Sequence, residues 1–213
     1  MELVWRILRG ARVPNVIEWT LARHAHERGL RQVTAAPGVR FGPSARVINA
    51  GDPARIHVGA KTLVDGELMV LDYGGRIAIG ESTYIGMGSR LWSGESLRVG
   101  DHVFISHNVT VTDTNAHQLD AAERAAHYQR TVVEGQPFQK GSIETAPVVI
   151  EDHAWLNFNV AVLKGVTIGE GAIIGVNSVV VTDIPAYSVA MGNPARVVFK
   201  NIDSPKQAAP QVT

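Results

Sequence analysis

His117 has the surroundings best suited to chemistry in this chain of 213 residues. It lies in the segment 112–124, which reads Thr-Asp-Thr-Asn-Ala-His-Gln-Leu-Asp-Ala-Ala-Glu-Arg. A histidine that titrates near neutral pH can remove the proton of an attacking hydroxyl group. Such a base needs an acceptor on its second ring nitrogen, either a main-chain carbonyl or a carboxylate, for which Asp113 or Asp120 could serve. The residues leave both acids open, and they also leave open a purely structural hydrogen bond for the histidine.

The elements that must position His117 follow a six-residue period. An aliphatic residue returns every six positions at Ile150, Leu156, Val162, Ile168, Ile174 and Val180. The positions four later are small or branched: Ala154, Val160, Val166, Ala172, Ser178 and Ile184. The same frame occurs earlier at Ile79, Ile85 and Leu91, at Val99, Ile105 and Val111, at Val58, Val64 and Val70, and from Phe41 to Val47.

This period fits neither a helix nor a hairpin sheet, and it predicts short strands stacked as a solenoid with three hexapeptides per turn. The leading aliphatic residues should point inward. Gly169 and Gly175 directly follow such residues, and we expect them to supply backbone angles closed to other residues. Val and Ile outnumber Leu, which agrees with a mostly β chain.

Most of the eight histidines have a structural explanation. His102 and His153 lie three places after an inward aliphatic residue, which is typical of an exposed turn. His107 falls midway along a coil, just before the repeat is interrupted, and is a candidate substrate-binding residue.

Three segments lie outside the period. Residues 1–34 contain a helical pattern that ends at Gly29 and predict a cap on the open end of a domain spanning 35–200. Their basic excess favours, as an alternative, contact with an anionic membrane surface. Residues 118–147 predict a long functional loop. Residues 201–213 are polar and contain proline, which predicts a disordered tail.

Composition excludes several classes of protein. The chain has 20 basic and 20 acidic side chains and no cysteine. The balanced charge argues against a nucleic-acid partner. Without cysteine there is no disulfide framework, thiolate metal site or cysteine nucleophile. No apolar run approaches the roughly 18 residues of a membrane span, and no signal peptide is evident, so we expect a cytoplasmic protein.

From about Val39 to Lys200 the chain resembles the hexapeptide-repeat acyltransferases, which implies a left-handed parallel β-helix. The sugar O-acetyltransferases of the maltose and galactoside type carry a similar Thr-x-His-Pro-Leu-Asp-x-x-x-Arg segment, in which the histidine is the general base. This chain has Gln118 in place of the proline, while Leu119, Asp120 and Arg124 match.

The resemblance also implies where acetyl-CoA and its acceptor would bind. The implied cofactor-binding residues are Trp155, Phe158, Val176, Val181, Thr182, Arg196 and Lys200. Trp155 would lie beside the base, the backbone of segment 174–185 would pair with the pantetheine arm, and Arg196 would meet a CoA phosphate. Glu95 matches an acidic residue that contacts substrate hydroxyls. Residues 157–159 depart from the family pattern near the expected position of the thioester. Residues 86–88 depart from it near the expected acceptor site, so the acceptor is left open.

The resemblance therefore predicts a homotrimeric, acetyl-CoA-dependent O-acetyltransferase whose sites lie between subunits, with no metal. Its acceptor would be a hydroxyl of a saccharide or glycolipid, attacked directly on the thioester with His117 as base and Asp120 as its orienter. One alternative is N-acetylation of an amino sugar or antibiotic. Another is a zinc protein similar to the γ-type carbonic anhydrases, using His102 and His107. A scaffold without catalysis is the third.

Overall fold

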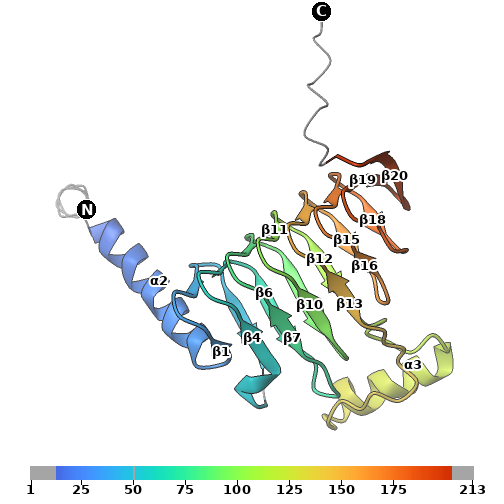
Figure 1. Cartoon of the computed structure of the whole chain (residues 1–213). Coiled ribbons are helices and arrows are strands. Elements are labelled where there is room, and N and C mark those ends of the chain that lie inside the picture. Colours follow the sequence, from blue (N-terminus) through green and yellow to red (C-terminus); the bar gives the residue numbers. More distant parts are fainter. Residues whose placement is uncertain (1–12, 50, 203–213) are drawn as a thin grey trace, which may run out of the picture.

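The computed structural model describes residues 13–49 and 51–202, with side chains from Thr20 onward. It is a solenoid in which each coil contributes one short strand to each of three parallel sheets (Figure 1). Sheet A contains β1 (Thr34–Ala35), β4 (Ile56–Val58), β7 (Ile77–Ile79), β10 (Leu97–Val99), β13 (Val148–Ile150) and β16 (Thr167–Ile168). Sheet B contains β2 (Arg40–Phe41), β5 (Leu63–Val64), β8 (Tyr84–Ile85), β11 (Phe104–Ile105), β14 (Trp155–Leu156), β17 (Ile173–Ile174), β19 (Ser188–Gly192) and β20 (Ala195–Lys200). Sheet C contains β3 (Arg46–Ile48), β6 (Glu67–Val70), β9 (Arg90–Ser93), β12 (Thr110–Thr112), β15 (Ala161–Val162) and β18 (Val179–Val180).

The hexapeptide ladder forms the core, as the period predicts. The six leading aliphatic residues from Ile150 to Val180 are fully buried, and the small or branched residues four positions later are buried with them. The earlier registers are buried in the same way, except that Val47 is only partly buried. Parallel pairing places equivalent residues of successive coils beside each other, for example Ile105 against Leu156. The core is therefore a stack of aliphatic layers along the axis of the solenoid.

We name the three corners of each coil AB, BC and CA after the sheets that they join. Left-handed backbone angles occur at the AB and BC corners, at His102 (φ 55°) and Asn108 (φ 59°) in one coil. His107 precedes Asn108 and lies at the BC corner between β11 and β12. His107 therefore lies within the coil that runs from β10 to β12, at a corner and not on a strand.

Gly169 and Gly175 are required because other parts of the chain approach them closely, and not because their backbone takes an unusual φ angle. A Cβ on Gly169 would collide with the backbone nitrogen of Ala186, and one on Gly175 would lie 2.8 Å from the Cβ of Met191. Neither glycine is among the residues with positive φ. The expectation of unusual angles at these two positions is wrong, because the next layer of chain passes directly over them.

The N-terminal helix α2 (Val13–Leu30) covers the first coil. Ala25 is buried, and His26 Nδ1 accepts a hydrogen bond of 3.2 Å from the backbone N–H of Phe41. Gly29 lies so close to the Phe41 ring that an added Cβ would be 2.5 Å from it. These contacts place α2 over the first coil. Residues 1–12, on which the membrane alternative partly depends, and residues 203–213 of the expected tail lie outside the described residues.

At the other end, β19 stacks in parallel on β17 and pairs antiparallel with β20. The last strands thus form a hairpin on sheet B instead of another hexapeptide coil. No helix in the described part of the chain is long and apolar enough to cross a membrane.

The long loop leaves the solenoid at the CA corner, between β12 and β13 (Figure 1). It departs at Asp113, five residues before the start that the sequence predicts, and returns at Pro147. It contains a helix, α3 (Ala121–Tyr128), continued by a short π-helix, η2 (Gln129–Val133). The coils on both sides of it pair directly, through β10 with β13 and β12 with β15, so the loop is extruded from an otherwise continuous stack.

Candidate active site

His117 lies at the start of the extruded loop and is exposed. It forms part of the wall of a cavity of about 400 Å³, a size that suits a small-molecule ligand. The opposite walls come from α3, η2 and the returning segment, through Tyr128, Val132 and Phe138. The loop therefore folds back to make a mostly apolar cavity beside the histidine that the sequence singles out.

The base of the loop is closed by backbone hydrogen bonds. Ala146 N–H donates to the carbonyl of Asp113 at 2.9 Å, and Thr114 forms an antiparallel bridge with Thr145. Asn115 N–H also donates to the Glu144 carbonyl at 3.0 Å. The departing and returning strands are thus joined like the ends of a hairpin, which holds the segment leading to His117.

Asp113 links this base to the preceding coil. Its fully buried carboxylate accepts hydrogen bonds from Ser93 Oγ (2.6 Å), Gly94 N–H (2.6 Å) and Glu95 N–H (3.1 Å). Glu95, the predicted acceptor-binding residue, therefore lies at the same corner as the root of the His117 loop. Buried carboxylates are held in this way by several donors, which gives Asp113 a structural role.

Asp120 is the N-cap of α3, and its Oδ1 accepts from Glu123 N–H at 2.8 Å. This is the usual role of aspartate before a helix. Both Asp113 and Asp120 therefore have hydrogen-bond partners other than His117. Among the described residues, no hydrogen bond joins either carboxylate to His117, so the role of one of them in orienting the base stays a prediction. Arg124 donates from Nη1 to the carbonyls of Gln118 (2.7 Å) and Leu119 (3.0 Å), and holds the turn that follows His117.

Sequence reasoning missed a buried pair inside the loop. Gln118 is 2% exposed and His127 is 4% exposed, and the Gln118 Nε2 lies 2.7 Å from His127 Nδ1. The His127 ring lines the cavity and packs edge-on against Phe138, with ring centroids 4.3 Å apart. The one available signal was Gln118 itself, a polar residue where the resembling enzymes have proline.

An aromatic contact fixes this part of the loop to the solenoid. Phe138 stacks on Tyr73 with ring centroids 5.3 Å apart, and the Tyr73 hydroxyl lies 2.8 Å from Thr114 Oγ1. Burial raises the pKa of Tyr73, against the opposing effect of the Thr114 hydrogen bond, and the charge of Asp113 raises it further. The phenol therefore stays protonated and available for this hydrogen bond.

The predicted cofactor residues Trp155, Phe158 and Val176 lie on sheet B and its BC corner. Trp155 is 41% exposed and donates from Nε1 to Ser106 Oγ at 3.3 Å. Phe158 is 49% exposed and packs edge-on against His107, with ring centroids 5.7 Å apart. Successive coils stack at this corner, since Asn177 N–H donates to the Phe158 carbonyl at 3.0 Å.

His107 is held by its neighbour Tyr84, whose hydroxyl lies 3.2 Å from His107 Nε2. Burial raises the pKa of Tyr84, and the charge of Asp65 adds to this effect. The phenol therefore keeps its proton and can donate to Nε2, which would leave the imidazole proton on Nδ1. His107 is thus placed with Phe158 and apart from the loop.

The remaining predicted cofactor residues lie elsewhere. Val181 and Thr182 follow β18 at the CA corner, across sheet C from the BC corner. Arg196 and Lys200 are exposed in β20, where Arg196 Nη1 donates to the carbonyl of Ala195 at 2.9 Å. The structure therefore brings Glu95 and His117 to the CA side and Trp155, His107 and Phe158 to the BC side, without joining the two groups within one chain.

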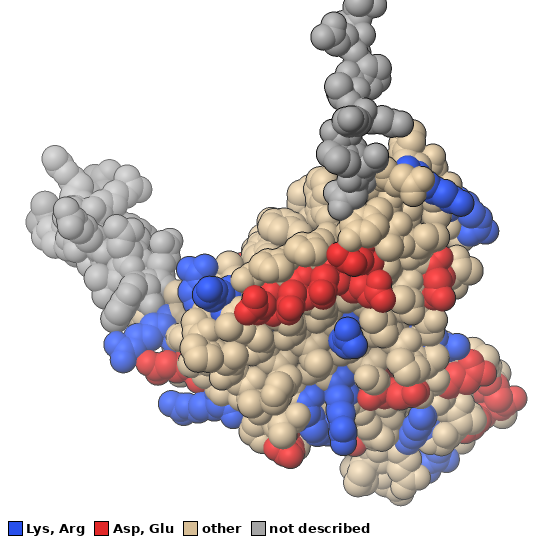
Figure 2. Space-filling model, in the orientation of Figure 1, with Lys and Arg blue, Asp and Glu red and all other residues tan. Residues whose placement is uncertain are grey.

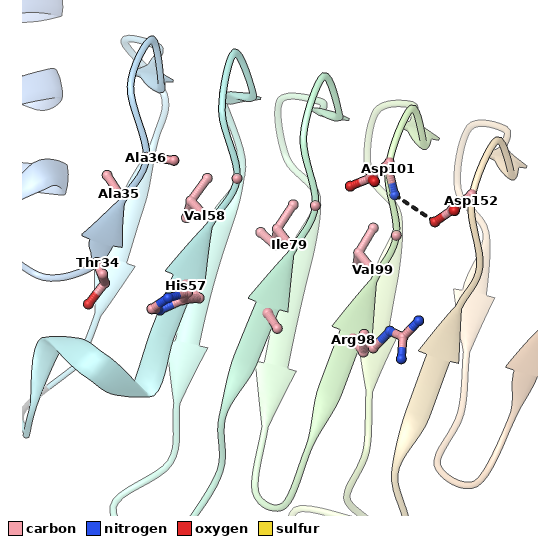
Figure 3. A pocket seen from close by; sticks show the side chains of 14 residues that line it. Thr34, Ala35, Ala36, His57, Val58, Ile79, Arg98, Val99, Asp101 and Asp152 are labelled. Carbon is pink, nitrogen blue, oxygen red and sulfur yellow. Dashed lines mark hydrogen bonds between the residues drawn. The ribbon is translucent and has the colours of Figure 1, made fainter.

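A separate groove of about 470 Å³ crosses sheet A (Figure 3). His57 and Arg98 border it, and the small side chain of Ala78 lies between their strands. Asp101 and Asp152 rim it at the AB corner (Figure 3), and acidic side chains gather in a row on this face (Figure 2). Asp152 Oδ1 accepts from Asp101 N–H at 2.9 Å, and Asp101 Oδ1 accepts from Glu81 N–H at 2.7 Å. These two rim acids tie one coil to the next, and none of the predicted site residues lies in this groove.

The arrangement of the histidines does not suit a zinc site built from His102 and His107. His102 lies at the AB corner and stacks on His153, with ring centroids 5.1 Å apart, whereas His107 lies at the BC corner on the other side of β11. In the part of the chain that the structure describes, no group of three or more His, Asp or Glu side chains could hold a metal ion. The carbonic anhydrase alternative therefore fails on the placement of its two histidines.

Comparison with known proteins agrees with this architecture. Residues 147–182 match the family described as bacterial transferase hexapeptide (six repeats). The protein of Saccharomyces cerevisiae named "Putative acetyltransferase YJL218W" is 34% identical over 129 residues, which are 61% of this chain and 58% of that protein. The family match covers the C-terminal coils from β13 to β18. The chain spans less than two thirds of the length of this curated relative.

Two solved structures share the fold. One is the hexapeptide-repeat acetyltransferase VCA0836 of Vibrio cholerae in complex with acetyl coenzyme A, with a TM-score of 0.52, 22% identity, and coverage of 86% of this chain and 84% of that one. The other is AntD, an N-acyltransferase of Bacillus cereus in complex with dTDP-4-amino-4,6-dideoxyglucose and coenzyme A, with a TM-score of 0.63, 18% identity, and coverage of 82% and 88%. The solenoid is therefore a left-handed parallel β-helix.

Proposed function

We propose that this protein is an acetyl-CoA-dependent O-acetyltransferase that acetylates a hydroxyl group of a saccharide, with His117 as the general base. The observation that carries the proposal is the placement of His117 on the wall of a mostly apolar cavity built by the extruded loop. The match of residues 147–182 to the bacterial transferase hexapeptide family and the name of the yeast relative, "Putative acetyltransferase YJL218W", support the acyl-transfer chemistry.

In this reaction His117 takes the proton of the acceptor hydroxyl as its oxygen attacks the thioester carbonyl carbon of acetyl-CoA. The C–O bond forms, a tetrahedral oxyanion results, and backbone N–H groups at the coil edge stabilise it. The intermediate then collapses with cleavage of the C–S bond. The proton held by His117 passes to the departing CoA sulfur, which leaves the acetyl ester and free CoA. A positioned base of this kind contributes about 10²–10⁴-fold to the rate.

The donor site requires a second copy of the chain in this proposal. His117 and Val181 lie at the CA side, whereas Trp155, Phe158 and Val176 lie at the BC side. A neighbour that sets its BC corner against this CA corner would complete the site. Repetition of such a head-to-tail contact closes a ring, and a homotrimer is the proposed assembly.

The surface of sheet B supports this assembly. Large apolar side chains are exposed on it and on the BC corner: Met87, Phe104, Trp155, Phe158 and Val176. Phe104 and Trp155 are neighbours in register on adjacent strands. Exposed apolar patches of this kind mark protein interfaces. A subunit contact would remove them from water and form one wall of the acetyl-CoA groove.

The test of the activity is release of CoA thiol from acetyl-CoA with a panel of saccharides, amino sugars, serine and simple amines. The chain has no cysteine, so the thiol signal comes from CoA alone. We expect release with saccharides and an ester product by mass spectrometry and NMR. An amide product formed only with amino sugars would show that the activity is N-acetylation and not O-acetylation. No release of CoA with any acceptor would contradict acetyl transfer.

The test of the shared site is mixing of subunits. His117→Ala and Trp155→Ala proteins are each expected to be nearly inactive, and co-refolded mixtures should regain activity because some interfaces carry both native residues. Mixtures of His117→Ala with His57→Ala, an exposed histidine on sheet A, calibrate the exchange of subunits. Absence of recovery in the first mixture alone would contradict a site made by two subunits.

A further inference from the structure

The extruded loop buries two polar atoms without a partner. Among the described residues, the buried side-chain nitrogens and oxygens that lack a hydrogen bond are Gln118 Oε1 and His127 Nε2. A buried polar atom that is left unpaired lowers the stability of the folded protein. Two such atoms in one contact, beside a cavity, need a partner that comes from outside the chain.

The hydrogen-bond logic holds for either orientation of the Gln118 amide. With Nε2 facing His127, the amide donates to Nδ1, so the imidazole proton lies on Nε2 and seeks an acceptor. With the amide reversed, Oε1 accepts from Nδ1–H, and the bare Nε2 seeks a donor. A hydroxyl group can donate and accept, so it satisfies His127 Nε2 in both cases.

Among the described residues, no acidic or basic side chain forms a hydrogen bond or ion pair with His127. The Arg124 guanidinium, which also lines the cavity, donates to the carbonyls of Gln118 and Leu119 and so orients the backbone behind the pair. The ring of His127 is held edge-on to Phe138, which is itself stacked on Tyr73 of the solenoid. The ring that carries Nε2 is therefore held in place, while Nε2 itself is buried, so a ligand reaches it only when the cavity widens beside the ring.

The ring that carries this nitrogen and the proposed base line the same cavity. His117 and His127 line the same space of about 400 Å³, and most of the rest of its wall is apolar, including Tyr128, Val132 and Phe138. A ring with one apolar face and several hydroxyl groups fits such walls, since carbon–hydrogen bonds can pack on aromatic rings while a hydroxyl reaches the single buried nitrogen. A saccharide has this form.

We propose that His127, backed by Gln118, is the specificity-determining residue of the acceptor subsite. It would bind one hydroxyl of a saccharide ring through Nε2 while a second hydroxyl faces His117. The inference rests on the proposed acetyl transfer for the role of the second hydroxyl, whereas the binding of the first does not depend on turnover. The Gln118–His127 pair distinguishes this chain from the sugar O-acetyltransferases that it resembles, because those enzymes have proline in place of Gln118.

The test is a comparison of hydroxyl-deleted ligands in native protein and in His127→Phe. The probes are methyl β-glucoside, methyl β-galactoside and their monodeoxy analogues. For native protein we expect one deoxy position to weaken binding and kcat/KM by about 10–100-fold, the cost of leaving a buried polar group unpaired. In His127→Phe the same analogue and its parent should be equal, with KM for the parent raised and affinity for acetyl-CoA unchanged.

His57→Phe is the matched control, since it changes an exposed strand histidine on sheet A. A second variant, Gln118→Leu, keeps the His127 ring but frees Nδ1, and it should weaken the same discrimination without removing it. Binding measured by calorimetry, without acetyl-CoA, separates the two proposals. If glycosides bind with the expected discrimination but no CoA is released, acetyl transfer fails and the subsite stands.

Three results would overturn the subsite. One is the same deoxy discrimination in His127→Phe and native protein, another is no binding of any glycoside by native protein, and the third is a crystal structure in which only a water molecule occupies the space at Nε2 while a bound glycoside lies elsewhere.

Discussion

The solenoid and the extruded loop differ in how completely their buried polar groups are hydrogen-bonded. In the coils, Thr83 Oγ1 donates to the Gly100 carbonyl at 3.0 Å and accepts from Val103 N–H at 3.1 Å, so one hydroxyl ties two coils together. In the loop, Gln118 and His127 are as deeply buried but leave an oxygen and a nitrogen unpaired. A scaffold satisfies its polar groups internally, whereas a binding site keeps some for a ligand.

The difference extends to connectivity. The coils before and after the loop pair without it, through β10 with β13, β11 with β14 and β12 with β15. Each coil is supported by its neighbours, as in other solenoids. The loop can therefore carry unpaired groups, because the stability of the stack does not depend on it.

The largest expected effect follows from removing the loop. Replacement of residues 116–143 by Asn-Gly would join Asn115 to Glu144, whose backbones are already hydrogen-bonded at 3.0 Å, by a two-residue hairpin turn. Activity should fall by about 10³-fold or more, since the deletion removes both the base and the acceptor cavity. Circular dichroism and acetyl-CoA binding by calorimetry should be nearly unchanged.

Collapse of the fold in this shortened protein would contradict the independence of the stack. Retention of activity would contradict the role of the loop.

A second prediction compares adjacent residues of β14. Leu156→Ala removes a fully buried ladder residue and should lower the free energy of unfolding by about 2–5 kcal/mol. Trp155→Ala, on the outer face of the same strand, should cost about 1 kcal/mol or less in the isolated subunit and instead weaken acetyl-CoA binding. Urea unfolding and calorimetry measure the two effects. Equal destabilisation by the two changes would contradict the assignment of inward and outward faces.

The six-residue frame made the ladder and its burial predictable from the sequence, because each inward position repeats at fixed spacing and depends only on its own coil. His117 could be selected because it stands where the repeat fails. The pairing of Gln118 with His127 could not be predicted, because it depends on the path of a loop without any period. The division of the predicted cofactor residues between two corners could not be predicted either, because it depends on how the three sheets of each coil separate residues onto different corners.

A third prediction tests the contrast in polar groups directly. Thr83→Val keeps the shape of a buried residue but leaves the Gly100 carbonyl and Val103 N–H without this partner, and should destabilise by about 1–3 kcal/mol. The double change Gln118→Leu with His127→Phe removes both members of an incompletely paired contact, and should leave stability equal or raised.

Thermal unfolding of both proteins checks this, with Thr110→Val on β12 as the control for a threonine in sheet C. A greater loss of stability in the double variant than in Thr83→Val would mean that the loop pair is structural.

The smallest expected effect concerns the contact that holds the loop. Tyr73→Phe keeps the stack on Phe138 but removes the hydroxyl that lies 2.8 Å from Thr114 Oγ1, at an expected cost of about 0.5–1.5 kcal/mol. Hydrogen exchange followed by mass spectrometry should show faster exchange in residues 116–143 and unchanged exchange in the coils. Faster exchange across the whole chain would contradict a local contact.

The most direct test of the central claim is the rate of acetyl transfer in His117→Ala. In single-turnover experiments with the best saccharide acceptor, the account predicts a rate lower by about 100-fold or more, with the dissociation constant for acetyl-CoA unchanged. His57→Ala should transfer at the native rate. A His117→Ala rate within about threefold of native, at saturating acceptor and donor, would contradict the assignment of His117 as the base and the loop cavity as the acceptor site.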